Sequence, residues 1–277
     1  MLVLAVDTST PACSVALVEI GPASSTGPRP GDPGLAGLVP EPGPAGLVAD
    51  PSGGPAVAAA PAPALAPVHL LAHRRVVDAR RHGELLAPLV EAVLAEAATR
   101  PADLAALVVG LGPGPFTSLR VGIVTAHTFA AALGVPCHGV CSLDGIGAAT
   151  TGQAGVVTDA RRREVFWAGY ADGRRIAGPA VNYPARAAEL LLAAGMDTLA
   201  GPGQALYPDA FTAFSAAVAG SGLPLAGPSG PEYPNPAVLA GLAAADVGGG
   251  RVPAPLTPIY LRRPDVAEPH QAKPVTV

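Results

Sequence analysis

The chain is organised around the run Gly110-Leu-Gly-Pro-Gly-Pro-Phe-Thr-Ser-Leu-Arg-Val-Gly122. An apolar run at 104–109 leads into it and an apolar helical pattern leaves it. This order predicts a buried strand, a tight glycine turn and the start of a long helix. Glycines allow the backbone angles and the close approach that such a turn needs. Thr117 or Ser118 is expected to cap the helix by accepting hydrogen bonds from its first free N–H groups.

A glycine turn at a helix N-terminus can hold a phosphate, because the free N–H groups there attract anions. However, the run lacks the lysine of a P-loop, and its third glycine stands one place too early for the dinucleotide fingerprint. A structural turn is therefore favoured, with nucleotide binding as the alternative. A second turn, after the first apolar run, brings a carboxylate and hydroxyls. The candidate nucleotide or anion contacts are Asp7, Thr8, Ser9, Gly112, Gly114 and Thr117.

Composition indicates a cytoplasmic protein that does not bind nucleic acid strongly by itself. The net charge of the 277 residues is -4, whereas phosphate contacts supply most nucleic-acid affinity. Cys13, Cys137 and Cys141 are an odd number of thiols within apolar runs, which favours reduced core cysteines and no zinc site. No stretch reads as a signal peptide or as long and apolar enough to cross a membrane, so we expect no membrane association.

The order of patterns predicts two α/β lobes. Residues 1–150 read as β-β-β-α-β-α-β, interrupted at 21–67 by a segment rich in Pro, Gly and Ala that is expected to be disordered. Residues 151–277 form the second lobe and tail, with paired strands at 156–160 and 164–170 and helices near 189–194 and 236–245. The last helix is a candidate to pack back on the first lobe.

Two long helices of the first lobe carry broad apolar surfaces. Residues 83–98 form an amphipathic stripe wide enough to cover both a sheet and a partner helix. The helix at 117–133 has one apolar face and a second face of small residues, which permits close approach by another helix. By contrast, no catalytic constellation is visible: the histidines are scattered, and the G-x-S-x-G elbow of hydrolases is missing. We therefore predict no catalytic residues and no metal ligands.

Five segments, in order along nearly the whole chain, resemble the bacterial TsaB (YeaZ) family. Gly112-Pro-Gly-Pro-Phe-Thr-Ser-Leu-Arg-Val-Gly122 is similar to its G-P-G-S-F-T-G-[LV]-R-[IV]-G signature. Asp159-Ala-Arg-Arg-Arg-Glu-Val-Phe-Trp167 is similar to its D-A-R-x-x-E-V-Y segment. Residues 4–17, 82–88 and 258–262 resemble its opening, its entry into the first helix and its tail. The chain departs from the family at Pro115 and Ser118, which stand for Ser and Gly, and in the 21–67 insertion.

The resemblance implies a two-lobed actin/Hsp70-like ATPase fold, with mixed sheets flanked by helices. It also implies a part in forming N6-threonylcarbamoyladenosine at position 37 of tRNAs that read codons beginning with adenine. In that family a paralogue, TsaD, transfers the threonylcarbamoyl group. TsaB is its non-catalytic scaffold and activator, and TsaE joins as the ATPase. The chain would then need no cofactor of its own. ATP or ADP would bind within the complex, and tRNA would be bound by the complex.

The two broad helices are, on this resemblance, the candidate surface for TsaD, or for a homodimer when TsaD is absent. The residues implied for this surface are His82, Leu85, Leu86, Leu89, Val93, Phe116, Arg120, Val121, Val124, Thr125 and Thr128. The alternative is a stand-alone enzyme of the same fold, either a phosphotransferase or a metallopeptidase-like protein. An independent tRNA-binding module is disfavoured by the acidic balance of charge.

Overall fold

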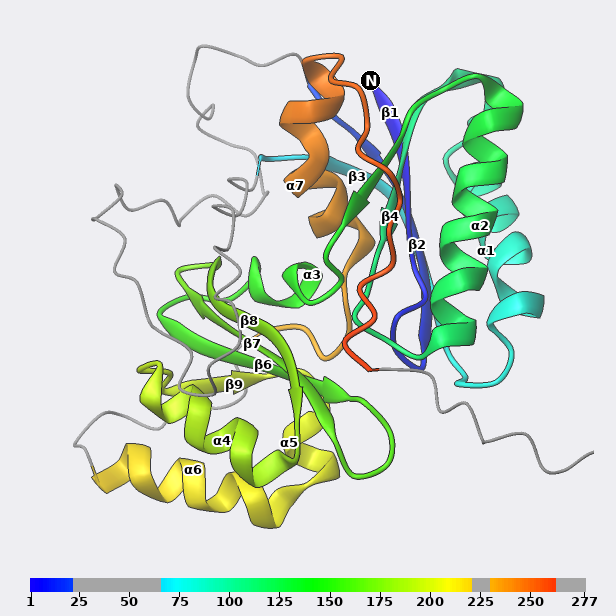
Figure 1. The fold of residues 1–277 in the computed structure, drawn as a ribbon. Helices are drawn as coiled ribbons and strands as arrows, with labels where there is room; N and C mark the ends of the chain where they lie inside the picture. The colour runs from blue at the N-terminus through cyan, green and yellow to red at the C-terminus, as the bar shows by residue number, and fades with distance from the viewer. Residues whose placement is uncertain (22–65, 221–229, 263–277) are drawn as a thin grey trace, which may run out of the picture.

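The computed structural model describes residues 1–21, 66–220 and 230–262, which form two sheets, each flanked by helices (Figure 1). The 21–67 insertion expected to be disordered lies outside the described residues, apart from Gly21 and residues 66–67. A mixed α/β fold with two sheets and flanking helices confirms the fold class expected from the sequence.

The first sheet has the strand order β3-β2-β1-β4-β5. Its strands are β1 (Leu2–Asp7), β2 (Ala12–Glu19), β3 (His69–Val77), β4 (Leu104–Gly110) and β5 (Cys137–Val140). β1, β2 and β3 are antiparallel neighbours, whereas β1, β4 and β5 run parallel. Parallel pairing brings the carboxyl ends of β1, β4 and β5 to one edge of the sheet, where the glycine turn begins.

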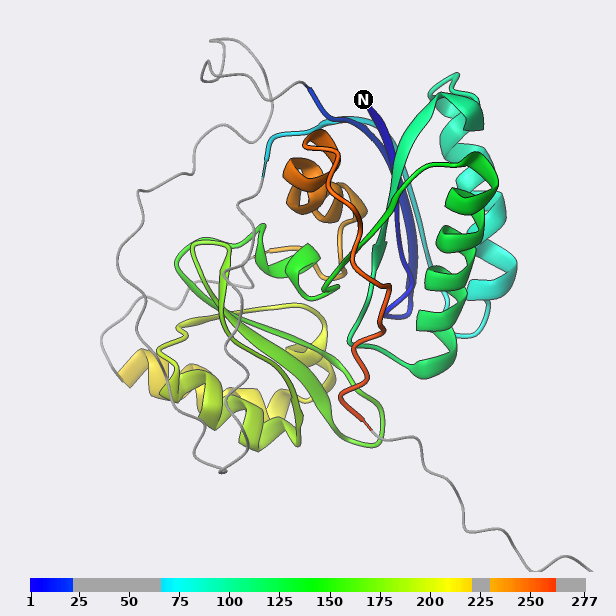
Figure 2. The ribbon, with the colours of Figure 1, turned by 45° about the horizontal axis from the view of Figure 1, so that its top comes forward.

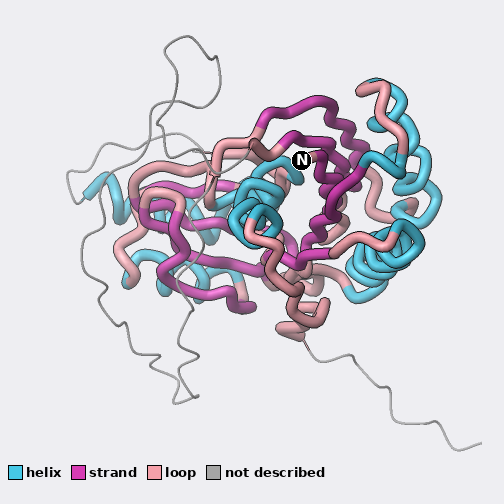
Figure 3. The backbone as a smooth tube through the Cα atoms, turned by 90° about the horizontal axis from the view of Figure 1, so that it is seen from above, coloured by secondary structure: helices cyan, strands magenta, loops and turns pink. Residues whose placement is uncertain are grey.

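Helices cover both faces of the first sheet. α1 (His82–Glu96) and α2 (Phe116–Leu133) pack on one face, and α7 (Pro236–Gly248) packs on the other (Figures 1 and 2). Successive residues of a strand point to opposite faces, so Leu4 and Val6 contact the α1–α2 side, whereas Val3 and Ala5 contact α7. Seen from above, α7 lies between the two sheets (Figure 3).

The second sheet has the order β8-β7-β6-β9. Its strands are β6 (Gln153–Asp159), β7 (Val165–Ala171), β8 (Arg174–Asn182) and β9 (Thr198–Ala200). α4 (Pro184–Ala193) and α6 (Pro208–Gly220) pack together against it, while α3 (Asp144–Gly147) packs between it and α7. Two short helical turns complete the described elements, η1 (Pro101–Asp103) and α5 (Gly203–Leu206).

The start of α2 differs from the sequence prediction. The helix begins at Phe116, and the residue before it, Pro115, is extended and provides no side-chain cap. The hydroxyl of Ser118 donates to the Pro115 carbonyl at 3.0 Å rather than accepting from an N–H group. Capping by Thr117 or Ser118 is therefore wrong, because both residues already lie inside the first helical turn. The helix ends normally, with Gly134 left-handed at φ 70°.

α2 also corrects the expectation that no stretch is long and apolar enough to cross a membrane. Its 18 residues have a mean hydropathy of 1.2, and 33% of them are buried. A single helix of this kind is weak evidence for a membrane span. Its buried side packs on β4, β1 and α1, so an apolar helix is left with a largely uncovered outer side.

Candidate functional site

The glycine turn packs against the turn that follows β1. A Cβ atom on Gly110 would collide with the Asp7 carboxylate, and one on Gly114 would collide with the Ser9 carbonyl oxygen. Farther along α2, a Cβ atom on Gly122 would collide with the Thr8 hydroxyl. These glycines are thus required by close approach of the chain to itself. A side chain at any of these three positions would have no room.

Asp7 is the centre of a buried hydrogen-bond network at this edge of the sheet. Its Oδ1 accepts from the Ser9 N–H at 2.9 Å and from the Ser9 hydroxyl at 2.7 Å. Its Oδ2 accepts from the hydroxyl of Ser142, whose oxygen in turn accepts from the Gly112 N–H at 3.0 Å. Thr8 donates to the Ser118 carbonyl at 2.7 Å. The network connects β1, the glycine turn, α2 and Ser142, the second residue after β5.

Burial shapes the chemistry of this network. Asp7 is 1% exposed, and this burial raises the pKa of its carboxyl above the ordinary 3.8, against the hydrogen bonds from Ser142 and Ser9 that lower it. Among the candidate anion contacts, the structure brings Asp7, Thr8, Ser9, Gly112 and Gly114 together, all buried except the partly exposed Gly114. Thr117 is the exception, because it is exposed and lies on the outer side of α2.

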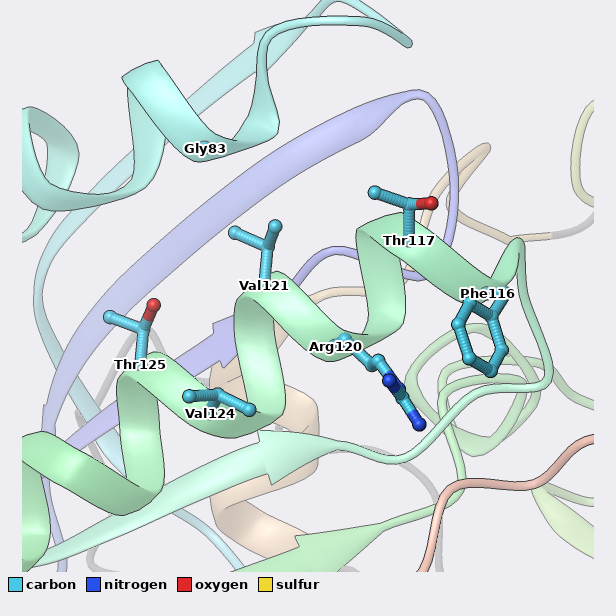
Figure 4. Close-up of a pocket in the computed structure, with 7 residues that line it drawn as sticks. All are labelled: Gly83, Phe116, Thr117, Arg120, Val121, Val124 and Thr125. Atoms are coloured by element: carbon cyan, nitrogen blue, oxygen red, sulfur yellow. The ribbon is translucent and has the colours of Figure 1, made fainter. Parts of the chain in front are cut away.

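An open groove of about 470 Å³ lies outside this network, between the start of α1 and the outer side of α2. The groove is lined by Gly83, Phe116, Thr117, Arg120, Val121, Val124 and Thr125. Figure 4 shows Thr117, Val121 and Thr125 pointing toward the helix that carries Gly83, while Phe116 and Arg120 point to the other side of α2. Val124 is 58% exposed and Phe116 is 44% exposed. The groove therefore has mainly apolar lining and is open to solvent.

Four residues predicted for the partner surface belong instead to the core. Leu86, Leu89 and Val93 are buried between α1 and the first sheet, and His82 is 5% exposed. The ring Nε2 of His82 lies 2.8 Å from the Thr10 carbonyl oxygen, which holds the start of α1 to the turn between β1 and β2. The prediction was wrong for these four because the apolar stripe of α1 includes the residues that cover the sheet.

The remaining residues predicted for that surface are open to solvent to different degrees. Exposed are Phe116, Arg120, Val124 and Thr128. Half-buried are Leu85, Val121 and Thr125. They share the outer sides of α1 and α2. Gly83, which the sequence did not single out, lines the groove from α1. Its lack of a side chain leaves open space above α1.

The other carboxylates that end apolar runs have partners of their own. Asp144 accepts from the Tyr170 hydroxyl at 2.7 Å and lies 3.3 Å from Arg175 Nη1. Burial nevertheless raises the pKa of Asp144. Asp159 lies 3.3 Å from Arg161 Nη1. In the described part of the chain, no three His, Cys, Asp or Glu side chains gather as a metal site would require.

Comparison with known proteins places these features in a family. The sequence model described as TsaD, tRNA N6-adenosine threonylcarbamoyltransferase, matches residues 76–226. An uncharacterised protein of Mycobacterium tuberculosis is 50% identical over 208 residues, which cover 75% of this chain and 85% of that protein. The tRNA threonylcarbamoyladenosine biosynthesis protein TsaB of Escherichia coli is 34% identical over 96 residues, which cover 33% of this chain and 42% of TsaB.

The fold also has solved counterparts. YeaZ from Pseudomonas aeruginosa superposes with a TM-score of 0.58 at 24% identity, covering 94% of this chain and 99% of that one. At this identity the likeness concerns the fold, which is of the actin/Hsp70-like type. Family membership supports a role in the threonylcarbamoyladenosine modification of tRNA. The two lobes, the self-packed glycine turn and these matches lead to one conclusion: the chain belongs to the TsaB (YeaZ) family.

Proposed function

We propose that this chain is the non-catalytic scaffold and activator that lets a TsaD paralogue modify adenosine 37 of tRNAs reading codons that begin with adenine. The observation that carries the proposal is the open apolar groove on the outer side of α1 and α2. Neighbouring exposed apolar side chains are a feature of surfaces that bind other proteins. Val124 and Phe116 are its largest exposed apolar side chains.

The kinship of the chain with TsaD supports the choice of partner. The matching sequence model is that of the transferase itself, and the matched residues 76–226 include both α1 and α2. Two related chains can present the same pair of helices to each other, as in an isologous interface. The four helices then pack with their small and apolar faces together. The same geometry allows a homodimer when the paralogue is absent.

The polar groups beside the glycine turn are bonded within the chain, which supports a non-catalytic role. The Asp7 carboxylate is occupied by Ser9 and Ser142, and the nearby hydroxyl of Thr8 donates to α2. Groups that are buried and bonded within the chain are not free to activate a substrate. We therefore assign chemistry to the paralogue, ATP or ADP and the TsaE ATPase to the assembled complex, and tRNA contact to the complex in the cytoplasm.

Reconstitution tests this proposal. The full chain, its TsaD paralogue and TsaE are purified separately and combined with unmodified tRNA and the threonylcarbamoyl donor. Mass spectrometry of digested tRNA should show the modified nucleoside only when this chain and the paralogue are both present. Substantial ATP or peptide turnover by the chain alone, lost on Asp7→Ala, would support a stand-alone enzyme and overturn the proposal.

A further inference from the structure

The end of the described chain forms a strap across both lobes. Residues 253–262 run extended along the surface from the α7 side toward the β6–β7 hairpin (Figures 1 and 2). Leu256 packs against the core of the first lobe. The Ile259 N–H donates to the Leu111 carbonyl at 2.8 Å, and the side chains of Ile259 and Leu261 pack on the core of the second lobe. The strap is therefore held by both lobes.

An arginine fixes the end of this strap on the second lobe. Arg262 Nη2 lies 3.1 Å from Glu164 Oε2, and Arg262 Nη1 donates to the Ala160 carbonyl at 3.3 Å. Ala160 and Glu164 flank the loop between β6 and β7. Ile259 is fixed on Leu111 and Arg262 is fixed on this loop. The two residues between them, Tyr260 and Leu261, are therefore held in place from both sides.

Tyr260 contacts two residues at the start of α2, Phe116 and Arg120. Its ring lies 5.1 Å from the ring of Phe116, with an angle of 29° between the planes. Its hydroxyl oxygen accepts from Arg120 Nε at 3.3 Å, and the Arg120 guanidinium lies 4.1 Å from the centre of the Phe116 ring. Phe116 is thus stacked on one aromatic ring and covered by one cation. Both Phe116 and Arg120 line the groove.

We propose that the strap is part of the partner surface and that Tyr260 holds Phe116 and Arg120 in the orientation that the partner binds. This inference rests on the proposed function, because the occupant is the TsaD paralogue. Among the described residues Arg120 forms no ion pair, and its Nε is directed to Tyr260. Its terminal nitrogens are suited to a carboxylate of the partner. The groove thus combines an apolar floor with one oriented cation at its end.

Orientation matters here because long side chains lose rotational freedom on binding. A partner that meets Phe116 and Arg120 already stacked loses less of this freedom than one that must order them. Tyr260 is accordingly a positioning residue whose contribution passes through Phe116 and Arg120. Phenylalanine at this position keeps the stacking and loses only the hydrogen bond, whereas alanine loses both.

The test measures the affinity of the full chain for the TsaD paralogue by titration calorimetry. Tyr260→Ala should weaken binding about tenfold, and Tyr260→Phe by less than about threefold. In a Phe116→Ala background, Tyr260→Ala should add less than about threefold, because the stacking partner is gone and only the hydrogen bond with Arg120 remains to be lost. Arg120→Gln should flatten the dependence of affinity on salt concentration. Thermal unfolding of each variant checks that the fold is retained.

The outcomes separate this inference from the proposed function. If the wild-type chain binds and Tyr260→Ala binds equally well, the role of the strap is refuted while pairing stands. If Tyr260→Ala costs the same in the Phe116→Ala background as alone, Tyr260 does not act through Phe116, and the inference is again refuted. If the wild-type chain does not bind the paralogue at all, both proposals fail.

Discussion

Val124 gives the sharpest test of the groove between α1 and α2, because it is the most exposed of the large apolar residues on α2. A side chain that is 58% exposed can accept arginine in the free chain at a cost within about 0.5 kcal/mol. In a complex that covers it, full burial of valine is worth about 1.5 kcal/mol, so the part still exposed contributes about 0.9 kcal/mol. Val124→Arg loses that contribution.

The charge of the new arginine accounts for the larger part of the loss of binding free energy. Arginine at this position stands one turn after Arg120 and, inside an apolar contact, brings a desolvation cost of several kcal/mol. Together with the lost burial, the expected loss of binding free energy is about 3 kcal/mol or more, which is roughly a hundredfold in Kd. Calorimetry against the TsaD paralogue measures the affinity, and circular dichroism with thermal unfolding measures the fold.

Ile176→Arg is the matched control. Ile176 is 47% exposed on β8 in the second lobe, away from the groove, so this variant has the same chemistry in a different place. Its affinity should stay within about twofold of the wild type. Equal affinity for Val124→Arg and the wild type would refute the assignment of the groove. A fall of equal size for both variants would show a general effect of charge instead.

Three further predictions concern the core of the molecule. Leu89→Ala should lower the free energy of unfolding by about 2–3 kcal/mol, because Leu89 is 8% exposed under α1; a change near zero in denaturant titration would contradict this burial. Burial raises the pKa of Cys13 and Cys137 to about 11 and that of Cys141 to about 12, so these thiols should react with a thiol reagent at pH 8 only after unfolding; rapid reaction of the native chain would contradict this placement. Because the pKa of Asp7 is raised above 3.8 in the folded chain, the folded state binds more protons in the window above pH 3.8, and its stability falls as pH rises through that window. Asp7→Asn should remove this fall, and an unchanged slope of unfolding free energy against pH would refute the assignment.

Local patterns were sufficient for much of the first lobe. The strand, glycine turn and helix around residues 104–133 follow from one apolar run, three glycines and a helical period. The observed β4 and α2 have those positions within a few residues. In the second lobe the strands at β6 and β7 were also recognisable from their apolar runs. Patterns of this kind are local, so they can be read without knowing the tertiary contacts.

The contacts between distant segments could not be predicted in this way. Ser142 meets Asp7 only because β5 lies beside β4 and β4 beside β1. A residue directly after a strand is a candidate for such an edge, but the order of strands decides which residues meet. The helix α6 was missed because small residues dilute the apolar spacing of Phe211, Phe214 and Val218.

The sequence predicted only part of the exposed surface of α1 and α2, because that surface also depends on contacts between distant segments. The apolar stripe of α1 is broad, and periodicity does not say which part of a broad stripe faces the sheet. Leu86 and Leu89 therefore entered the predicted surface although both are buried. On α2 the exposed residues Val124 and Phe116 stood out only once the sheet was seen to cover the opposite side.

One measurement tests the central claim most directly: tRNA modification by the reconstituted system with three forms of this chain. The wild type, Asp7→Asn and Val124→Arg are each titrated against a fixed amount of TsaD paralogue, TsaE and tRNA, and the modified nucleoside is measured by mass spectrometry. A docking subunit predicts that Asp7→Asn supports modification like the wild type, whereas Val124→Arg supports it only at roughly hundredfold higher concentration. Full activity with Val124→Arg and none with a folded Asp7→Asn would contradict the claim and place the chemistry in this chain.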